Sequence, residues 1–364
     1  MKVLHVSAAK NWGGGENHLQ NLCTELKGAE HFVLCSKGSE VQKKLPVLRI
    51  KTIAAALPVK FDPRYIRKLI KICKREKIDL IHIHDTTALT LAIMATKISG
   101  KLPPYILSKK TSFPIKQRKQ TLYKYNHQQI KKILCVSEVT KKITAEAIVD
   151  QSKLVTVYHG TKIPKDSSAA FDLRKKYNIP SDSILVGTIA NHIRAKNLDT
   201  WVDTIDHLVN TLGHKNFYFL EIGNITERTA DFERKLKERK LEAYYKFTGF
   251  IPDASALIPQ FDISLMTSQS EGIPQFIYES FYYKVPVVST NVGGIPEIIE
   301  EGKNGFLSES HNGRSLGDKL VILSKDPEMQ KEFTAISYKK LVENYTTVKM
   351  ASDTLAQYKE VLYG

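Results

Sequence analysis

The sequence predicts an α/β protein in which two parallel-sheet domains face a cleft. Three observations lead to this fold class. Short apolar runs alternate with stretches of helical periodicity along the chain. A polar segment near the middle interrupts this alternation. The 364 residues, with 42% hydrophobic content, suffice for two separate cores. Alternating strands and helices are typical of parallel sheets that helices cover on both faces.

The first half opens with a strand at 3–7, a glycine loop at 13–15 and a helix at 16–27, whose leucines share one side. A second helix, 63–76, has apolar residues at helical spacing on one face (Ile66, Leu69, Ile70 and Cys73) and basic residues on the other. A third helix is expected at 87–98. Further strands are expected at 31–35, 80–84, 105–107, 133–136 and 155–158.

The segment 162–183 carries prolines, serines and charges, and it is interpreted as a linker between two strand-rich halves. The pattern then restarts, with helices expected at 198–212 and 231–239. Strands are expected at 184–190, 217–222, 245–248, 262–266 and around 285–288. Two such halves imply a cleft, and ligands of open parallel sheets bind beyond the carboxyl ends of the strands.

The net charge of +16 is unevenly placed, because only Glu138 opposes the many basic residues between 97 and 142. Such a surface attracts anions. The basic face of helix 63–76 fits either a solvated surface helix or attachment to an anionic membrane, and the sequence leaves both open. The four cysteines lack C-x-x-C spacing and are predicted to be reduced core residues. With no long apolar run and a strand at its start, the chain is expected to be cytoplasmic.

Three loops that follow predicted strands carry candidate site residues. Gly13–Gly15 let a ligand approach the backbone at a helix start. Arg194 and Lys196 offer cations for a diphosphate, and the absence of any Asp-x-Asp motif predicts a site without a metal. Glu271 and Glu279 flank a predicted helix start, where carboxylates accept hydrogen bonds from vicinal hydroxyls. With Pro274 as its first residue, that helix would present the amides of Gly272, Ile273, Gln275 and Phe276.

The stretch "EGIPQFIYE" followed by "VPVVSTNVGGIPEIIEEGKNGFL" resembles the donor-site signature of the retaining glycosyltransferases of family four, which have the GT-B fold. The resemblance extends over most of the chain. "GGGEN" is similar to the first glycine loop of the family, "DLIHIHD", "ILCVSE" and "VTVYHG" to strands of its acceptor domain, and "FTGFIPD" to the segment that contacts the nucleotide base.

The resemblance implies a role for each matching position. Glu279 would hold the ribose hydroxyls, Glu271 would contact the transferred sugar, and Lys196 would bind the diphosphate, with Gly14 and Gly15 nearby. Phe250 and the residues from Gly272 to Phe276 would complete the donor site. Two departures stand out. The arginine usual in the family is Asn191 here, which leaves Arg194 as the second cation. The acceptor-loop histidine is replaced by "SKKTSFP", so that Lys109, Lys110 or Thr111 would take its place.

Through the resemblance, residues 1–165 would bind the acceptor, 166–344 would bind the donor, and a helix at 345–364 would return to the first domain. The implied activity is retaining transfer of a hexose-type sugar, without metal or other cofactor, from a nucleotide sugar to a glycan or lipid-linked acceptor of cell-surface polysaccharide assembly. The basic first domain adds a possible attachment to the inner face of the membrane. Two alternatives stay open: a hydrolysing nucleotide-sugar epimerase of the same fold, and a basic nucleic-acid-binding protein, although no nucleic-acid motif occurs.

Overall fold

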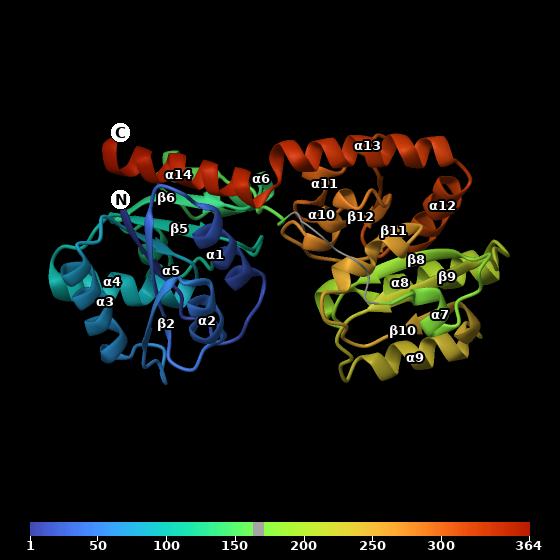
Figure 1. The fold of residues 1–364 in the computed structure, drawn as a ribbon, viewed down its shortest axis with the longest axis horizontal. Helices are drawn as coiled ribbons and strands as arrows, with labels where there is room; N and C mark the ends of the chain where they lie inside the picture. The colour runs from blue at the N-terminus through green and yellow to red at the C-terminus, as the bar shows by residue number, and fades with distance from the viewer. Residues whose placement is uncertain (163–170) are drawn as a thin grey trace. The chain divides into compact units, whose positions relative to one another are not determined.

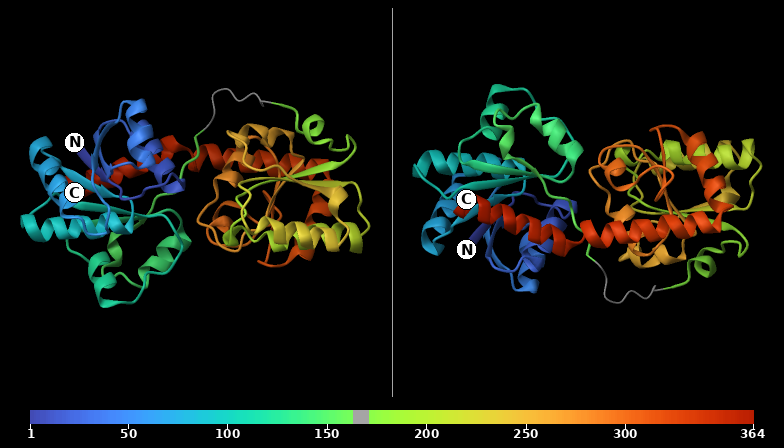
Figure 2. Two further views of the ribbon diagram at one scale, coloured as in Figure 1. Left: turned by 90° about the horizontal axis from the view of Figure 1, so that it is seen from below. Right: turned by 90° about the horizontal axis from the view of Figure 1, so that it is seen from above.

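The structure, a computed structural model, describes residues 1–162 and 171–364. The chain divides into two compact units. The first consists of Met1–Lys162 and Tyr345–Gly364, and the described part of the second is 171–344. Each unit has its own parallel sheet with helices on both faces (Figures 1 and 2). The prediction of two parallel-sheet α/β domains is therefore confirmed.

The first unit contains a seven-stranded parallel sheet in the order β3-β2-β1-β4-β5-β6-β7. Its strands are β1 Lys2–Val6, β2 Glu30–Ser36, β3 Lys51–Ala55, β4 Leu80–Ile83, β5 Tyr105–Lys109, β6 Ile130–Cys135 and β7 Leu154–Thr156. Successive side chains of a strand face opposite sides of the sheet. Leu4 accordingly joins the core on one face, and Val3 joins the core on the other.

The helices of this unit are α1 Gly14–Glu25, α2 Glu40–Lys44, α3 Pro63–Glu76, α4 Thr86–Ser99, α5 Lys119–Tyr125, α6 Glu138–Ala145 and α14 Thr347–Tyr363. Aspartates begin two of them: the Asp62 carboxylate accepts from Arg64 N at the start of α3, and the Asp85 carboxylate accepts from Ala88 N at the start of α4. Helices α3 and α4 pack with the Leu4 face of the sheet.

The last helix, α14, belongs to the first unit although α13 before it belongs to the second. Met350 and Tyr358 of α14 are buried with Val3 of β1, Leu80 of β4 and Leu22 of α1. The two ends of the chain therefore share one core, and both lie in this unit (Figure 1).

The second unit has a six-stranded parallel sheet in the order β10-β9-β8-β11-β12-β13. Its strands are β8 Ile184–Ile189, β9 Phe217–Ile222, β10 Tyr245–Phe247, β11 Ile263–Met266, β12 Val287–Thr290 and β13 Phe306–Ser308. Its helices are α7 Leu173–Tyr177, α8 Leu198–Asp206, α9 Thr229–Glu238, α10 Gln275–Tyr282, α11 Ile295–Ile298, α12 Gly313–Ser324 and α13 Pro327–Asn344. Trp201 of α8 is fully buried in the core of this unit.

Several predicted boundaries were wrong. Helix α1 begins at Gly14, so two of the three glycines lie in its first turn and not in a loop. Strand β5 runs on to Lys109, beyond the predicted 105–107. Strand β3 was missed because its "KTIAA" sequence is short and only partly buried. On α3 the core residue is Ile72, whereas Ile70 is half-buried. Pro274 precedes α10 as its N-cap and is not its first residue.

The structure describes only part of the predicted linker 162–183. Residues 163–170, and with them the predicted boundary at 165, lie outside the described residues. The later part of the segment folds into α7 Leu173–Tyr177, which the Asp172 side chain caps. The four cysteines are free and buried, as predicted.

Candidate active site

In the second unit, three loops at the carboxyl edge of the sheet are joined by hydrogen bonds. They follow the adjacent strands β8, β11 and β12. Gln269 N donates to Ala195 O (2.9 Å), Thr267 Oγ1 donates to Lys196 O (3.1 Å), and Gly294 N donates to Gly272 O (2.8 Å). Strand order thus brings together segments that lie far apart in the sequence.

Lys196 and Glu271 meet at this edge. Lys196 Nζ lies 2.5 Å from Glu271 Oε1, and the same oxygen accepts from Ser268 Oγ at 2.7 Å. Their side chains are only 20% and 13% exposed, so solvent screens this ion pair less than a surface pair. The structure therefore brings the predicted diphosphate cation into contact with the predicted sugar-binding carboxylate.

Helix α10 begins beside this pair. Ile273 and Phe276 are buried and anchor its start. Ile277 N donates to Pro274 O (3.2 Å), so the amides of Gln275 and Phe276 precede the hydrogen-bonded turns of the helix. Such amides at a positive helix end favour an anionic or hydroxyl oxygen.

Glu279 lies on α10 between the buried residues Tyr278 and Ser280. Burial raises the pKa of its carboxyl to about 7. No hydrogen bond or ion pair engages this carboxylate within the described parts of the chain. A half-buried carboxylate without a partner is costly in a free protein, and hydroxyl donors of a ligand would satisfy it.

Gly293 explains how the loop after β12 reaches Glu271. Its φ is +57°, and a Cβ at this position would lie 1.8 Å from the backbone oxygen of Glu271. Only glycine combines this left-handed conformation with so close an approach. The sequence showed Gly293 as part of the family signature but did not reveal its contact.

Arg194 and Phe250 are placed differently. Arg194 is exposed, at the start of a 3₁₀ turn that ends at Lys196. Phe250 is 66% exposed. No hydrogen bond or ion pair joins either side chain to Lys196 or Glu279 in the described structure, and their assigned roles stay predictions.

A buried histidine–glutamate contact under the same edge was missed by sequence reasoning. His192 Nε2 and Glu221 Oε2 lie 2.6 Å apart, both fully buried, and His192 Nδ1 lies 2.6 Å from Thr229 Oγ1. Burial raises the pKa of Glu221, and its Oε1 has no partner within the described residues. A glutamate in the apolar strand "FYFLEI" was the available signal.

The acceptor-side candidates lie in the first unit, at the end of β5. Lys109 is buried, and its ammonium donates to the backbone oxygens of Thr111 and Phe113 in its own loop. Thr111 is exposed. Lys110 Nζ instead donates to Gly15 O in the first turn of α1 (2.8 Å). Of the three candidates, only Lys110 contacts the glycine segment.

Burial sets the properties of Lys110. Burial lowers the pKa of its ammonium to about 8, while the nearby Glu16 and Asp85 act in the opposite direction. Gly14 has open space where a side chain would begin, and a Cβ on Gly15 would lie 3.7 Å from Lys110 Nζ. Lys110 therefore lies beside Gly15, while the space next to Gly14 is open.

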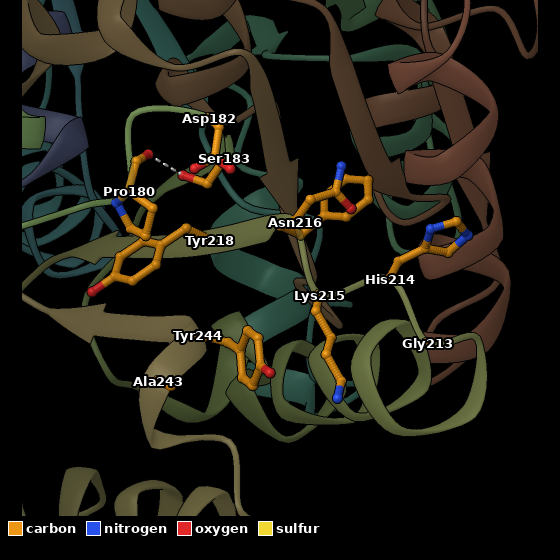
Figure 3. A pocket seen from close by; sticks show the side chains of 11 residues that line it. Pro180, Asp182, Ser183, Gly213, His214, Lys215, Asn216, Tyr218, Ala243 and Tyr244 are labelled. Atoms are coloured by element: carbon orange, nitrogen blue, oxygen red, sulfur yellow. Dashed lines mark hydrogen bonds between the residues drawn. The ribbon is translucent and has the colours of Figure 1, made fainter.

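A hollow of about 480 Å³ in the second unit lies elsewhere. Its residues precede β8, β9 and β10 or begin β9, at the amino-terminal edge of the sheet, and include Asp182, Lys215 and Tyr244 (Figure 3). Ser183 Oγ donates to Pro180 O across one side of it (2.7 Å). The hollow is thus at the opposite edge from Lys196 and Glu271, and ligands of parallel sheets bind at the carboxyl edge.

Two family models match consecutive parts of the chain. The model described as glycosyl transferases group 1 matches residues 170–340, and that of Glycosyltransferase Family 4 matches residues 12–163. N-acetyl-alpha-D-glucosaminyl L-malate synthase of Bacillus anthracis is 22% identical over 311 residues, 83% of this chain and 80% of the relative. The capsular polysaccharide biosynthesis glycosyltransferase CapH of Staphylococcus aureus is 24% identical over 316 residues, 84% and 85% of the two chains.

The O-antigen biosynthesis glycosyltransferase WclY of Escherichia coli is 29% identical over 180 residues, which are 49% of this chain and 47% of WclY. Among solved structures, a glycosyltransferase from Rickettsia africae superposes with a TM-score of 0.87 at 22% identity, covering 100% of this chain and 99% of the other. Anabaena HepE in complex with UDP gives a TM-score of 0.86 at 18% identity, covering 99% and 100%.

These neighbours, with the two parallel sheets, define the fold as that of a GT-B glycosyltransferase. The two family models together span most of the chain. The protein belongs to the family 4, or group 1, glycosyltransferases.

Proposed function

We propose that this glycosyltransferase moves a sugar from a nucleoside-diphosphate sugar to a glycan or lipid-linked acceptor, with retention of the anomeric configuration and without a metal ion. One observation carries the proposal: Lys196 and Glu271 touch each other at the carboxyl edge of the second sheet, next to the start of α10, whose Glu279 carboxylate has no partner among the described residues. A cation, amides and two carboxylates at one edge suit a ligand that carries both phosphates and sugar hydroxyls.

In this proposal the leaving diphosphate takes over Lys196 from Glu271. The cation and the amides at the start of α10 stabilise the charge that develops as the bond between the anomeric carbon and the phosphate oxygen breaks. Glu271 then accepts hydrogen bonds from the transferred sugar, and Glu279 accepts them from the ribose. The acceptor oxygen forms the new bond on the same face, and its proton passes to the leaving phosphate oxygen. Retention rests on the resemblance to the family.

The acceptor is proposed from the relatives. CapH and WclY are named for capsular polysaccharide and O-antigen biosynthesis, and we assign this protein to cell-surface polysaccharide assembly. HepE has been solved with UDP, so uridine diphosphate sugars are the first donors to test.

A peripheral membrane location is part of the proposal. No helix within 1–162 or 171–364 is long and apolar enough to cross a bilayer. The basic face of α3 is exposed, and Val59 and Phe61, just before α3, are 62% and 54% exposed. Cations near an anionic bilayer contribute about 1 kcal/mol each, which makes attachment through this face reversible. The basic residues are Arg64, Arg67, Lys68 and Lys71, with Lys116, Arg118, Lys119 and Lys124 in the next basic segment.

The first experiment is a thermal-shift screen with nucleoside diphosphates and nucleotide sugars, since a ligand specific for the folded protein raises its Tm. The best donor is then incubated with candidate acceptors, with and without EDTA, and the anomeric configuration of the product is read by NMR. Release of free sugar or an epimer without any acceptor would favour the epimerase. Inversion, or loss of activity in EDTA, would contradict the mechanism.

Membrane attachment is tested separately with liposomes of neutral lipid alone or with anionic lipid. Co-sedimentation should require the anionic lipid, weaken as salt is raised, and fall when the eight basic residues are changed to glutamine. Binding that ignores lipid charge and these substitutions would contradict a membrane role for the basic face.

A further inference from the structure

Six of the histidines lie close together in the first unit, three of them on β1, β2 and β4 and a fourth, His84, directly after β4. His5 and His82 are fully buried, His84 is 6% exposed and His31 is half-buried. His18 stacks on His159 with ring centroids 4.3 Å apart. Neutral histidines in a core need hydrogen-bond partners on their ring nitrogens. The identity of these partners therefore shows how the cluster is connected to the rest of the unit.

Three histidines of this cluster form a continuous chain of hydrogen bonds with Lys110. Lys110 Nζ lies 3.2 Å from His84 Nδ1, and His84 Nε2 lies 2.9 Å from His5 Nδ1. His5 Nε2 lies 2.9 Å from His31 Nδ1, and His31 Nε2 lies 3.1 Å from Leu26 O. The chain therefore crosses the adjacent strands β4, β1 and β2, from the carboxyl edge of the sheet to the end of α1.

The two ends of this chain fix the direction of every hydrogen bond in it. A carbonyl oxygen only accepts, so His31 Nε2 must donate to Leu26 O, and its Nδ1 must accept from His5 Nε2. An ammonium only donates, so His84 Nδ1 must accept from Lys110, and His84 Nε2 donates to His5 Nδ1. For neutral rings both ends require the same direction, and each ring then carries its proton on Nε2.

The burial of these histidines favours the neutral form of their rings. Desolvation lowers the pKa of His5 and of His84 well below the ordinary value, and the positive charge of Lys110 lowers both further. Desolvation also lowers the pKa of His31, with Lys27 acting in the same direction. A chain of bonds that all point one way polarises each member, which strengthens the acceptor offered to Lys110.

The same histidines do not suit a metal ion. The ring nitrogens of His5, His82 and His84 come within 4.8 Å of one another. All six nitrogens already have protein partners, because His82 bonds to Tyr358 OH (2.5 Å) and Ser108 Oγ (2.7 Å). A cation would have to break this network and would lie near the Lys110 ammonium.

We propose that His84, His5 and His31 act as positioning residues that hold Lys110 beside Gly15, with one ammonium N–H directed to an oxygen of the substrates. Two of the three ammonium protons serve Gly15 O and His84 Nδ1, and the third remains for a hydroxyl or phosphate oxygen. The inference rests on the proposed glycosyl transfer for the identity of that oxygen. The histidine chain itself stands on the contacts alone.

The hydrogen-bond chain from Lys110 to His31 is tested by ¹⁵N NMR of the histidine side chains in the full-length protein. Each signal is assigned with the matching His→Gln variant. We expect the neutral Nε2–H form for His5, His31 and His84. Lys110→Met should shift the ring nitrogens of all three and leave His127, a buried histidine of the same unit outside the chain, unchanged. Nδ1–H forms, charged rings or a His31 signal that ignores Lys110→Met would overturn the chain.

The role in transfer is tested by kinetics. Lys110→Met should lower kcat/KM roughly tenfold or more, as for a lost charged hydrogen bond, and Lys110→Arg should restore part of it. His31→Gln, at the remote end, should lower kcat/KM a few-fold at unchanged Tm, whereas the control His127→Gln should not. Equal effects of His31→Gln and His127→Gln would overturn the positioning role. If the wild type transfers no sugar, the proposed function fails, and the NMR result still decides the chain.

Discussion

Replacing Glu279 with glutamine is predicted to have opposite effects on protein stability and on nucleotide binding. In the free protein its carboxylate is half-buried without a partner in the described structure, and the pKa is raised from an ordinary value of 4.5 to about 7. Glu279→Gln keeps the shape and removes the charge. We expect this variant to be more stable than the wild type at pH 8, yet to bind nucleoside diphosphate more weakly.

The size of the stability effect follows from the pKa difference between the folded and unfolded states. Between the unfolded-state pKa of 4.5 and the folded-state pKa of about 7, the folded protein holds the Glu279 proton more tightly than the unfolded chain does. The stabilisation from this proton is complete below pH 4.5 and is lost as the pH rises through 7. The shift corresponds to about 3 kcal/mol. The advantage of Glu279→Gln should therefore be small at pH 5 and reach up to about 3 kcal/mol at pH 8.

Nucleotide binding should show the reverse dependence. If ribose hydroxyls donate to the ionised carboxylate, only that form binds well. With a pKa of about 7, roughly one-tenth of the free protein is ionised at pH 6 and nine-tenths at pH 8. The Kd should thus be about tenfold higher at pH 6 than at pH 8.

Calorimetric titration with the best nucleoside diphosphate at both pH values, with protein melting in parallel, measures both effects. The control is Glu242→Gln, an exposed glutamate of the same unit, which should change neither. Equal nucleotide affinity in wild type and Glu279→Gln, or a variant that is no more stable at pH 8, would refute the reasoning.

Three further predictions concern other contacts. Glu271→Gln should lower turnover roughly tenfold to a hundredfold, because it removes a charged hydrogen bond to the sugar. Nucleoside diphosphate should bind at least as tightly as in the wild type, because Lys196 is released. Steady-state kinetics measures the first effect and calorimetry the second. Gly293→Ala should cost roughly 2 kcal/mol or more, since its Cβ would lie 1.8 Å from Glu271 O, and denaturation measures it. Truncation after Asn344 removes Met350 and Tyr358 from the core of the first unit, so hydrogen exchange in β1 and β4 should accelerate.

Each of these has its own control or contrary result. Weaker nucleotide binding in Glu271→Gln would contradict competition for Lys196. Gly213→Ala also replaces a glycine with positive φ, but nothing lies within 4 Å of the added Cβ, so it should cost less than Gly293→Ala. Unchanged exchange in β1 and β4 after truncation would contradict the role of α14.

Local patterns in the sequence were enough to predict the fold class. Strand and helix periods repeat within a few residues, so the apolar runs at β1, β8 and β11 and the stripes of α3 and α8 could be recognised without tertiary information. The signature "EGIPQFIYE" likewise indicated the family, because its glutamates, glycine and proline lie within one loop and helix. Weak elements such as β3 escaped, since their burial comes from neighbours in the sheet.

The contacts that define the candidate site depend on the order of the strands. Lys196 meets Glu271 because β8 pairs with β11, and Gly293 reaches Glu271 because β12 lies next in the sheet. Lys110 is linked to His31 through His84 and His5 because β2, β1, β4 and β5 are consecutive in the sheet. Sequence periodicity is a local property, whereas strand order, burial and the resulting pKa values arise from packing between distant segments. Only the tertiary structure could therefore reveal these contacts.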